Sequence, residues 1–323
     1  MTDIMSDKEH FDNNNDQLLN DEKLLANQIK QYEAINDQRL NSSYPFIVRI
    51  DGVSFRNYTH GFNKPFDQRM TRAFIRTSAD LLQRFNPLTV FYQSDEISLV
   101  FDGYSTIDTI EKNPREHIYS GRIQKLVSVL ASYTAAKFNK YINEEDWSDI
   151  NNKHVQERLL SHSAYFDGRA FSVPNQFSAM ASIYWRHRYD TLKNSTLSYA
   201  LSYYSQNSIL GKSPYELRNL LRIEKNWDML NEAPKNIIYG TFLKKELYDL
   251  ECIDHKTQQS IIAKRSRIRI GSFDMNKLLQ TTEEKIKFIM SKYWNDCNTT
   301  IDNIEIPNWW MKYYQKQETS TTD

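Results

Sequence analysis

The chain of 323 residues is long enough to bury a substantial core, and its 20 Tyr and 16 Phe argue against disorder over most of its length. Lys plus Arg and Asp plus Glu both number 41, so the net charge is zero, which disfavours a protein that coats polyanions over its whole surface. The two cysteines form no metal-binding spacing and no disulfide framework, and no apolar run approaches the roughly 18 residues that span a bilayer.

Residues 1–23 are rich in Asp and Asn and lack both the apolar core of a signal peptide and the basic character of a transit peptide. They predict a disordered tail on a cytoplasmic protein. A helix over about 24–40 and a strand over about 45–51 are expected next. The Gly- and Pro-containing segment 59–65 predicts a loop, and Asp67 behind it is a candidate helix N-cap.

A strongly periodic helix and a pair of strands follow this loop. Apolar residues recur at the helical period from Met70 to Phe85, and Asn86-Pro87 ends the helix. Residues 90–101 predict either two strands joined by a tight turn at 94–96 or one strand with a bulge at that place.

The next segments supply a second helix and a further strand. The helix is expected over about 121–141, an acidic linker over 143–152, and the strand over about 164–173, with helical sequence from about 176 to 206. The order β-α-β-β-α-β is that of the ferredoxin-like split βαβ unit. We therefore expect an α+β fold with an antiparallel sheet, helices on one face and additional helices outside this unit.

Two acidic segments interrupt sequence that otherwise has the character of buried strands. Asp51 ends the first strand before Gly52, and Asp95 and Glu96 lie at the 94–96 turn. Carboxylates at such places are costly unless a cation holds them, and paired carboxylates are typical of two-metal phosphoryl or nucleotidyl transfer. The alternative is that Asp51-Gly52 is a turn and Asp95-Glu96 a solvated hairpin tip, because Asp-Gly is a common turn dipeptide.

Three basic residues are candidates for phosphate binding. Arg122 and Lys125 lie three positions apart near the start of the second long helix, and Lys64 lies in the loop after the first strand. Together they could clamp a triphosphate, although a solvated helix face is the commoner reason for one Arg/Lys pair. The P-loop signature is absent, which argues against a kinase of that type.

Basic and aromatic residues alternate around Trp185. Arg186, Arg188 and Lys193, together with Trp185 and Tyr189, make a pattern suited to stacking and phosphate contacts with RNA, and His187 lies among them. An amphipathic helix with a polar face would have the same pattern, so the residues alone leave both interpretations open.

At these residues the chain resembles the tRNA-His guanylyltransferase family, including its broader 3′–5′ polymerase-like members. The resemblance covers about residues 41–246. Each motif alone is weak, but their order along the chain is specific. The matching segments are 49–55, 61–67, 93–101, 120–128, 166–169, 190–195 and 210–213.

The resemblance implies a polymerase-palm-like catalytic domain over residues 24–250 and a C-terminal extension over 251–323 that contacts tRNA or a neighbouring subunit. It implies nucleotide addition to the 5′ end of tRNA after activation by ATP, with ATP, GTP and other nucleoside triphosphates as substrates. The family's assembly implies a homo-oligomer, a tetramer, and nothing in the family implies a membrane.

The resemblance also implies roles for individual residues. Asp51, the Gly52 carbonyl and Asp95 would hold two Mg²⁺ ions, with Glu96 as a supporting catalytic group. Basic and polar residues would contact the triphosphate or the activated 5′ end, namely Lys64, Ser94, Arg122 and Lys125. A further set would position nucleotide or tRNA, namely Arg186, His187, Asp190, Lys193 and Asn194.

Departures from the family pattern bear on the branch. The guanylyltransferase branch has a His-Ile-Asn motif after the Trp-Arg segment, and here Asp190–Ser195 contains no His. The chain thus resembles the polymerase-like branch, which repairs truncated tRNA by templated addition. Single guanylate addition to tRNA-His and a non-catalytic RNA-binding module remain the alternatives. The segment 186–190 is one residue longer than the usual spacing, and Val53 stands where Arg is frequent.

Overall fold

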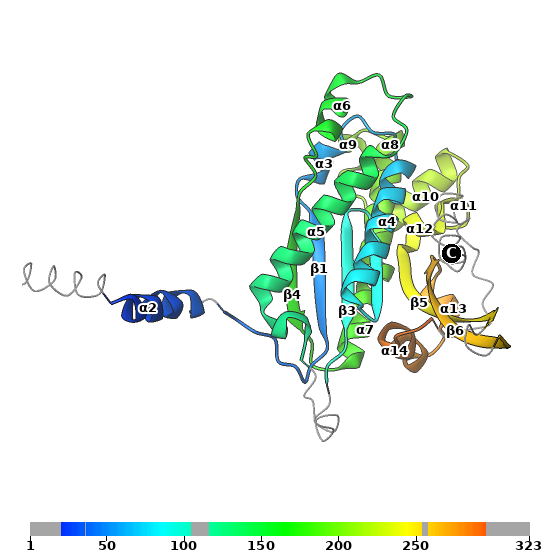
Figure 1. Cartoon of the computed structure of the whole chain (residues 1–323). Coiled ribbons are helices and arrows are strands. Elements are labelled where there is room, and N and C mark those ends of the chain that lie inside the picture. The colour runs from blue at the N-terminus through cyan, green and yellow to red at the C-terminus, as the bar shows by residue number, and fades with distance from the viewer. Residues whose placement is uncertain (1–20, 36, 105–115, 254–257, 295–323) are drawn as a thin grey trace, which may run out of the picture.

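The computed structural model describes residues 21–35, 37–104, 116–253 and 258–294. The expected disordered tail lies outside these residues except for its last three positions. Asp21 caps helix α2 (Glu22–Ala34) by accepting the N–H groups of Lys23 and Leu24 at 3.0 and 3.1 Å. This helix is shorter than expected, buries none of its residues and projects from the body of the molecule (Figure 1).

One six-stranded antiparallel sheet organises the chain, in the order β4-β1-β3-β2-β5-β6. Its strands are β1 (Phe46–Gly52), β2 (Thr89–Gln93), β3 (Glu96–Phe101), β4 (Phe166–Ser172), β5 (Thr241–Ile253) and β6 (Ser260–Gly271). With helices α4 (Gln68–Phe85) and α5 (Ile123–Asn143), the first four strands follow the expected β-α-β-β-α-β order. The α+β, ferredoxin-like prediction is therefore confirmed, and the stretch 90–101 forms two strands rather than one bulged strand.

Helices α4 and α5 lie side by side over one face of the sheet (Figure 1). Alternate residues of the central strands, such as Val48 and Ile50, turn their side chains to this face and join the larger core. Phe74 of α4 is fully buried there, which contributes about 2–3 kcal/mol to folding. Asp67 caps α4 as predicted, because its carboxylate accepts the N–H of Arg69 at 3.0 Å.

A second core covers the other face. Ile47 and Phe91 point to this side and pack with α7 (Gln176–Trp185), α13 (Met275–Leu278) and α14 (Thr282–Met290). Lys244 of β5 is fully buried beneath α14 and donates to the Phe288 and Ser291 carbonyls at 2.6 and 2.5 Å. Burial lowers the pKa of Lys244 to about 7, so the cap at the end of α14 is made by an amine that water hardly reaches.

The remaining elements are helices that lie outside this arrangement of the sheet, α4, α5 and the second core. They are α3 (Phe55–Tyr58), η2 (Ile118–Gly121), α6 (Lys153–Leu160), η3 (Arg186–Asp190), α8 (Thr191–Tyr203), α9 (Gln206–Ile209), α10 (Pro214–Glu224), α11 (Met229–Glu232) and α12 (Lys235–Tyr239). The expected domain boundary at residue 250 falls inside β5, so the start of the C-terminal extension shares the sheet. Among the described residues, no helix combines the length and apolarity needed to cross a membrane.

Candidate functional site

The two acidic segments meet at one end of the sheet. Antiparallel pairing of β1 with β3 places Asp51 opposite Glu96. Ser94 and Asp95 form the two-residue turn between β2 and β3, and the Gly52 N–H donates to the Asp95 carbonyl at 3.1 Å. This backbone contact ties the turn to the end of β1. The hypothesis that the acidic segments meet on neighbouring strands is therefore confirmed.

Asp51 and Asp95 both lie in surroundings that disfavour their charged forms. Burial and, after it, the charge of Asp51 raise the pKa of Asp95 to about 6. Burial and the charge of Asp167, which lies opposite on β4, raise the pKa of Asp51. Neither Asp51 nor Asp95 forms an ion pair with any residue that the structure describes. Two neighbouring carboxylates of this kind favour binding of a positive ion.

The carboxylates of Asp51 and Asp95 fit a Mg²⁺ site in which water and substrate supply the other ligands. Within the described ranges, no group of three or more His, Cys, Asp or Glu residues is placed to hold a metal ion. Mg²⁺ is commonly held by one or two carboxylates together with waters and substrate phosphates. Asp51 and Asp95 supply that number of carboxylates, and the Gly52 carbonyl as a third protein ligand stays a prediction.

Packing also explains why residue 52 is a glycine. A Cβ atom at this position would lie 2.2 Å from the Phe55 ring, so only glycine lets that ring close over the end of β1. Phe55 is buried in the larger core. The glycine thus keeps the strand end against the core, which fixes the backbone that carries Asp51.

Glu96 differs from the two aspartates because it is already paired. Its carboxylate lies 3.5 Å from Arg49 Nε and 3.2 Å from Arg186 Nη1. Burial raises the pKa of Glu96 to about 7, and the two arginines oppose that rise. A carboxylate held by two guanidinium groups is a poor candidate for a metal ligand and a good one for a support.

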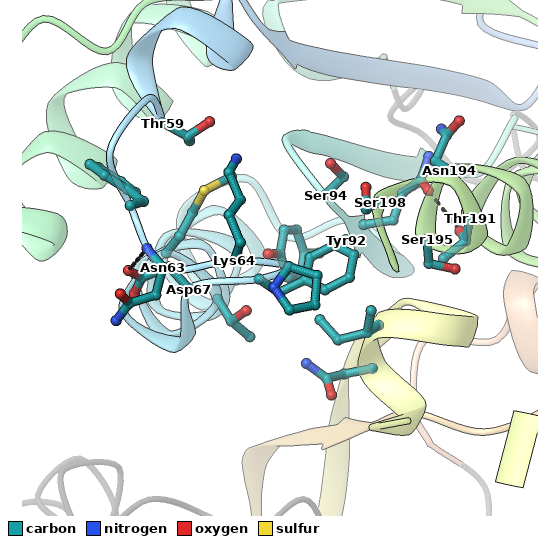
Figure 2. A pocket seen from close by; sticks show the side chains of 18 residues that line it. Thr59, Asn63, Lys64, Asp67, Tyr92, Ser94, Thr191, Asn194, Ser195 and Ser198 are labelled. Atoms are coloured by element: carbon teal, nitrogen blue, oxygen red, sulfur yellow. Dashed lines mark hydrogen bonds between the residues drawn. The ribbon is translucent and has the colours of Figure 1, made fainter. Parts of the chain in front are cut away.

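A pocket opens beside the β2–β3 turn (Figure 2). Its walls come from residues 59–67, the end of β2, α8 and the start of α12, and it holds about 860 Å³ of empty space including its open mouth. Of the predicted nucleotide contacts, Lys64 and Ser94 line this pocket, and Asn194 of α8 lies across from them. Lys64 is the one basic side chain among the described lining residues, and its ammonium group is exposed.

A hydrogen-bonded network joins the pocket to Glu96. Gln93 donates from Nε2 to Asp190 Oδ2 at 2.9 Å and accepts the hydroxyl of Thr191 at 2.7 Å. Arg186 binds the same Asp190 carboxylate at 2.7 Å while it reaches Glu96. Arg186 and Asp190 are thus brought together, and they hold α8 against the sheet.

The segment Arg186–Asp190 is a π-helix, in which the N–H of Thr191 reaches back to the Arg186 carbonyl. A π-helical turn contains more residues than an α-helical one and arises frequently at functional sites. It accommodates the additional residue noted in the spacing of this segment without a break between α7 and α8.

His187 lies in the protein interior, where its ring is bonded to the backbone of two other helices. It is fully buried, its Nδ1 lies 2.7 Å from the Tyr239 carbonyl, and its Nε2 accepts the N–H of Met275 at 3.1 Å. Burial lowers the pKa of His187 to about 4, so the ring is neutral and donates from Nδ1. In this conformation it joins η3 to α12 and α13, and any positioning of RNA would act through the fold. Lys193 and Asn194 are exposed on α8.

Arg122 and Lys125 are not among the residues that line the pocket. Arg122 pairs with Asp37 at 2.8 Å, in the segment before β1, whereas Asp51 lies near the other end of that strand. The ammonium of Lys125 lies 5.3 Å from the centre of the Tyr119 ring. Within one chain these two residues do not join Lys64, and their phosphate role stays a prediction.

Sequence reasoning missed three residues of this site. Arg49 holds Glu96, Gln93 holds Asp190, and Asp167 faces Asp51 across β1 and β4. The signal for Arg49 was the strand alternation, because a residue two positions before Asp51 lies on the same face. The pairings of Gln93 and Asp167 depend on tertiary structure.

Comparison with known proteins bears on the family and fold of the chain. The family model of tRNA-His guanylyltransferase matches residues 26–174. An uncharacterised protein of Acanthamoeba polyphaga mimivirus is 28% identical over 275 residues, which cover 83% of this chain and 90% of that protein.

Solved structures extend the similarity to three dimensions. A bacterial tRNA(His) guanylyltransferase (Thg1)-like protein in complex with ATP is similar, with a TM-score of 0.63, 28% identity and coverage of 82% of this chain and 99% of that chain. A structure of such a protein in complex with GTP has a TM-score of 0.59, with 27% identity and coverage of 81% and 98%. The tRNA(His) guanylyltransferase of Saccharomyces cerevisiae, at 20% identity over 65% of this chain and 90% of that one, shares the fold with a TM-score of 0.50.

Proposed function

Because the chain belongs to the tRNA-His guanylyltransferase family, a family of nucleotidyltransferases, we propose that it extends the 5′ end of truncated tRNA in the 3′–5′ direction, with base pairing to a template choosing each nucleotide. The observation that carries the proposal is the meeting of Asp51 and Asp95, unpaired and partly buried, beside a pocket whose one described cation is Lys64. A binding module has no physical need to hold two unpaired carboxylates against a polyanion.

The nucleotide would enter the pocket with its phosphates towards Lys64. The exposed ammonium balances phosphate charge, and the Ser94 hydroxyl at the turn offers a hydrogen bond beside it. The ATP and GTP complexes of the bacterial relatives support a nucleotide in this fold. Neutral polar groups of α8, among them Asn194 and Ser198, face the same space.

Asp51 and Asp95, with the Gly52 carbonyl, would hold two Mg²⁺ ions, which supply neutralisation of phosphate charge and activation of the attacking oxygen. In the reaction, a 5′-monophosphate oxygen first attacks the α-phosphorus of ATP and pyrophosphate leaves. The 3′-hydroxyl of the incoming nucleotide then attacks the activated 5′ phosphorus, its proton is released, and AMP leaves. A 5′-triphosphate end needs only this second step, with pyrophosphate as leaving group.

Two residues keep this arrangement rigid. Arg186 links Glu96 at the strand end to Asp190 at the start of α8, so the carboxylate end of the sheet and one pocket wall cannot move independently. Glu96 therefore acts as a support for Asp95, and Arg186 and Asp190 act as positioning residues. The exposed Lys193 is free to contact an RNA phosphate.

The templated branch is favoured by the segment Asp190–Ser195, which has no histidine where the guanylyltransferase branch has one. The alternative is addition of a single guanylate to tRNA-His. A homo-oligomer and tRNA as the macromolecular partner belong to the same proposal.

An incorporation assay on 5′-triphosphorylated tRNA that lacks its first nucleotide tests the proposal, because this substrate needs no separate activation by ATP. Each nucleoside triphosphate is supplied alone against four substrates that differ only in the nucleotide opposite the gap. We expect incorporation only of the complementary nucleotide. Guanylate addition on every substrate would favour the alternative, and no incorporation by the folded protein would favour the RNA-binding module.

A further inference from the structure

We propose that the acidic latch, defined as residues 144–149 between α5 and α6, positions the Lys64 loop, defined as residues 59–67, for nucleotide binding, with Trp147 and Asp149 as its positioning residues. The inference rests on the proposed function, because it takes Lys64 as the contact to the nucleotide's phosphates. It goes further by assigning a role to the linker that the sequence showed only as an acidic insertion.

The latch touches the two residues that precede Lys64. The Trp147 ring packs on the buried Phe62 ring with centroids 4.7 Å apart. The Asn63 side-chain amide donates to Asp149 Oδ2 at 3.3 Å. Because these contacts fall on consecutive residues, they fix where the backbone enters position 64.

The residue that closes the loop is fixed from the other side. The Asp67 carboxylate accepts the Asn63 N–H at 3.1 Å, so the loop is bonded across its own base. Arg69 then grips the same carboxylate through Nε at 2.9 Å and Nη2 at 2.8 Å. Asp67 and Arg69 are each only 6% exposed, so this two-point contact is shielded from water.

Arg69 joins the base of the Lys64 loop to the acidic latch. Its Nη1 donates to the Asp146 carbonyl at 2.9 Å and to the Asp149 carboxylate. Its guanidinium lies 4.0 Å from the centre of the Trp147 ring. One side chain therefore connects the loop base at Asp67 with both positioning residues of the latch.

The latch is anchored to α4 and α5 independently of the loop. Arg72 Nε binds Glu145 at 2.9 Å, Arg76 binds Glu144, and Trp147 donates from Nε1 to the Ile142 carbonyl at 2.9 Å. These contacts do not touch residues 59–67. They provide a control in which the latch is disturbed and the loop is not.

The physical consequence concerns binding more than chemistry. The exposed Lys64 ammonium is held only through the backbone that carries it, so a disordered loop would have to be ordered when the nucleotide binds. Loss of the latch contacts should therefore raise the Kd for nucleotide and KM together and leave kcat unchanged.

The test measures the Kd of ATP with Mg²⁺ and hydrogen exchange of residues 59–67. Asp149→Asn keeps the side-chain shape and removes the charge, and Glu144→Gln does the same at the other end of the latch, with the original side chains 54% and 41% exposed. We expect Asp149→Asn to raise Kd about 3- to 5-fold with faster exchange, Trp147→Leu about 10-fold, and Glu144→Gln less than about 1.5-fold. Trp147→Phe should recover most of the affinity, because it keeps a ring against Phe62.

A double variant separates positioning from general loosening. If the latch acts through Lys64, Asp149→Asn should add no further loss of affinity to Lys64→Gln. Additive losses, an effect of Glu144→Gln equal to that of Asp149→Asn, or unchanged Kd and exchange in both latch variants would overturn the inference. A wild-type protein that binds ATP but extends no tRNA would refute the proposed function alone, with the latch still judged by Kd. A wild-type protein that binds no ATP would contradict both.

Discussion

Two acidic regions lie close to the same pocket, and they differ in whether arginines meet them. In the latch, Glu144, Glu145 and Asp149 each bind an arginine of α4. At the sheet end, Asp51 and Asp95 bind no cationic side chain of the described chain, although Arg49 and Arg186 lie near enough to bind Glu96. The latch carboxylates and Glu96 are therefore paired with arginines, whereas Asp51 and Asp95 have no such partner among the described residues. Carboxylates left unpaired at that cost are placed for a ligand.

The largest expected effect is on catalysis at the unpaired carboxylates. Asp51→Asn and Asp95→Asn should each lower nucleotide incorporation by at least about 1,000-fold, because each removes a proposed metal ligand and its charge. Initial rates on the truncated tRNA measure this loss, with circular dichroism to confirm folding. Asp249→Asn, at an exposed position of β5, is the control and should retain full activity. Activity within about 10-fold of wild type in both site variants would contradict the functional difference between the unpaired carboxylates and those of the latch.

The second expected effect concerns stability, and it has opposite signs at Asp95 and at Asp67, which shares Arg69 with the latch residue Asp149. Asp67→Asn leaves the buried Arg69 without its main partner and should lower the free energy of unfolding by about 3–5 kcal/mol. Asp95→Asn removes repulsion from Asp51 and should raise that free energy by about 1 kcal/mol in metal-free buffer. Urea unfolding of the two variants measures both values. A loss of stability in Asp95→Asn would show that its carboxylate is structural.

The third prediction is a pH dependence. Since the pKa of Asp95 is raised to about 6 in the folded protein, the folded state binds more protons than the unfolded state between about pH 4 and pH 6. The stability contributed by protonated Asp95 is therefore present at low pH and is lost as pH rises, by about 2 kcal/mol in metal-free buffer. Glu96 titrates in the same direction, so the difference between wild type and Asp95→Asn isolates the Asp95 part. A flat difference across this range would contradict the assignment.

The smallest expected effect is at the exposed end of the latch. Glu144→Gln should change the free energy of unfolding by less than about 0.5 kcal/mol, because its pair with Arg76 is partly solvated. The same urea titration measures it. A loss above 2 kcal/mol would mean that the paired region depends on each ion pair more strongly than exposure suggests.

Much of the site was readable from local patterns. The apolar strand β1, the helical period of α4 and the N-cap at Asp67 are all properties of neighbours along the chain, and the structure confirms them. The meeting of Asp51 with the 94–96 turn followed from the antiparallel order of strands. These features are predictable because each depends on a short stretch of sequence and on the fold class.

Other features depend on contacts between distant segments. Arg69 meets Asp149 across 80 positions of the chain, and nothing in either segment alone indicates its partner. His187, surrounded by arginines in sequence, is fully buried because the π-helical turn directs it under α12. Arg122 lies beside Asp37 because α5 begins near the segment that precedes β1. Periodicity cannot supply such placements.

The most direct test of the central claim is a titration with Mn²⁺, used as a paramagnetic probe for Mg²⁺, in the presence of ATP and followed by electron paramagnetic resonance. Wild type should bind Mn²⁺ beyond the amount bound by ATP alone, and Asp51→Asn and Asp95→Asn should each lose that additional binding, while the exposed control Asp249→Asn keeps it. Equal Mn²⁺ binding by wild type and both site variants would contradict the claim that Asp51 and Asp95 are left unpaired in order to hold a divalent cation.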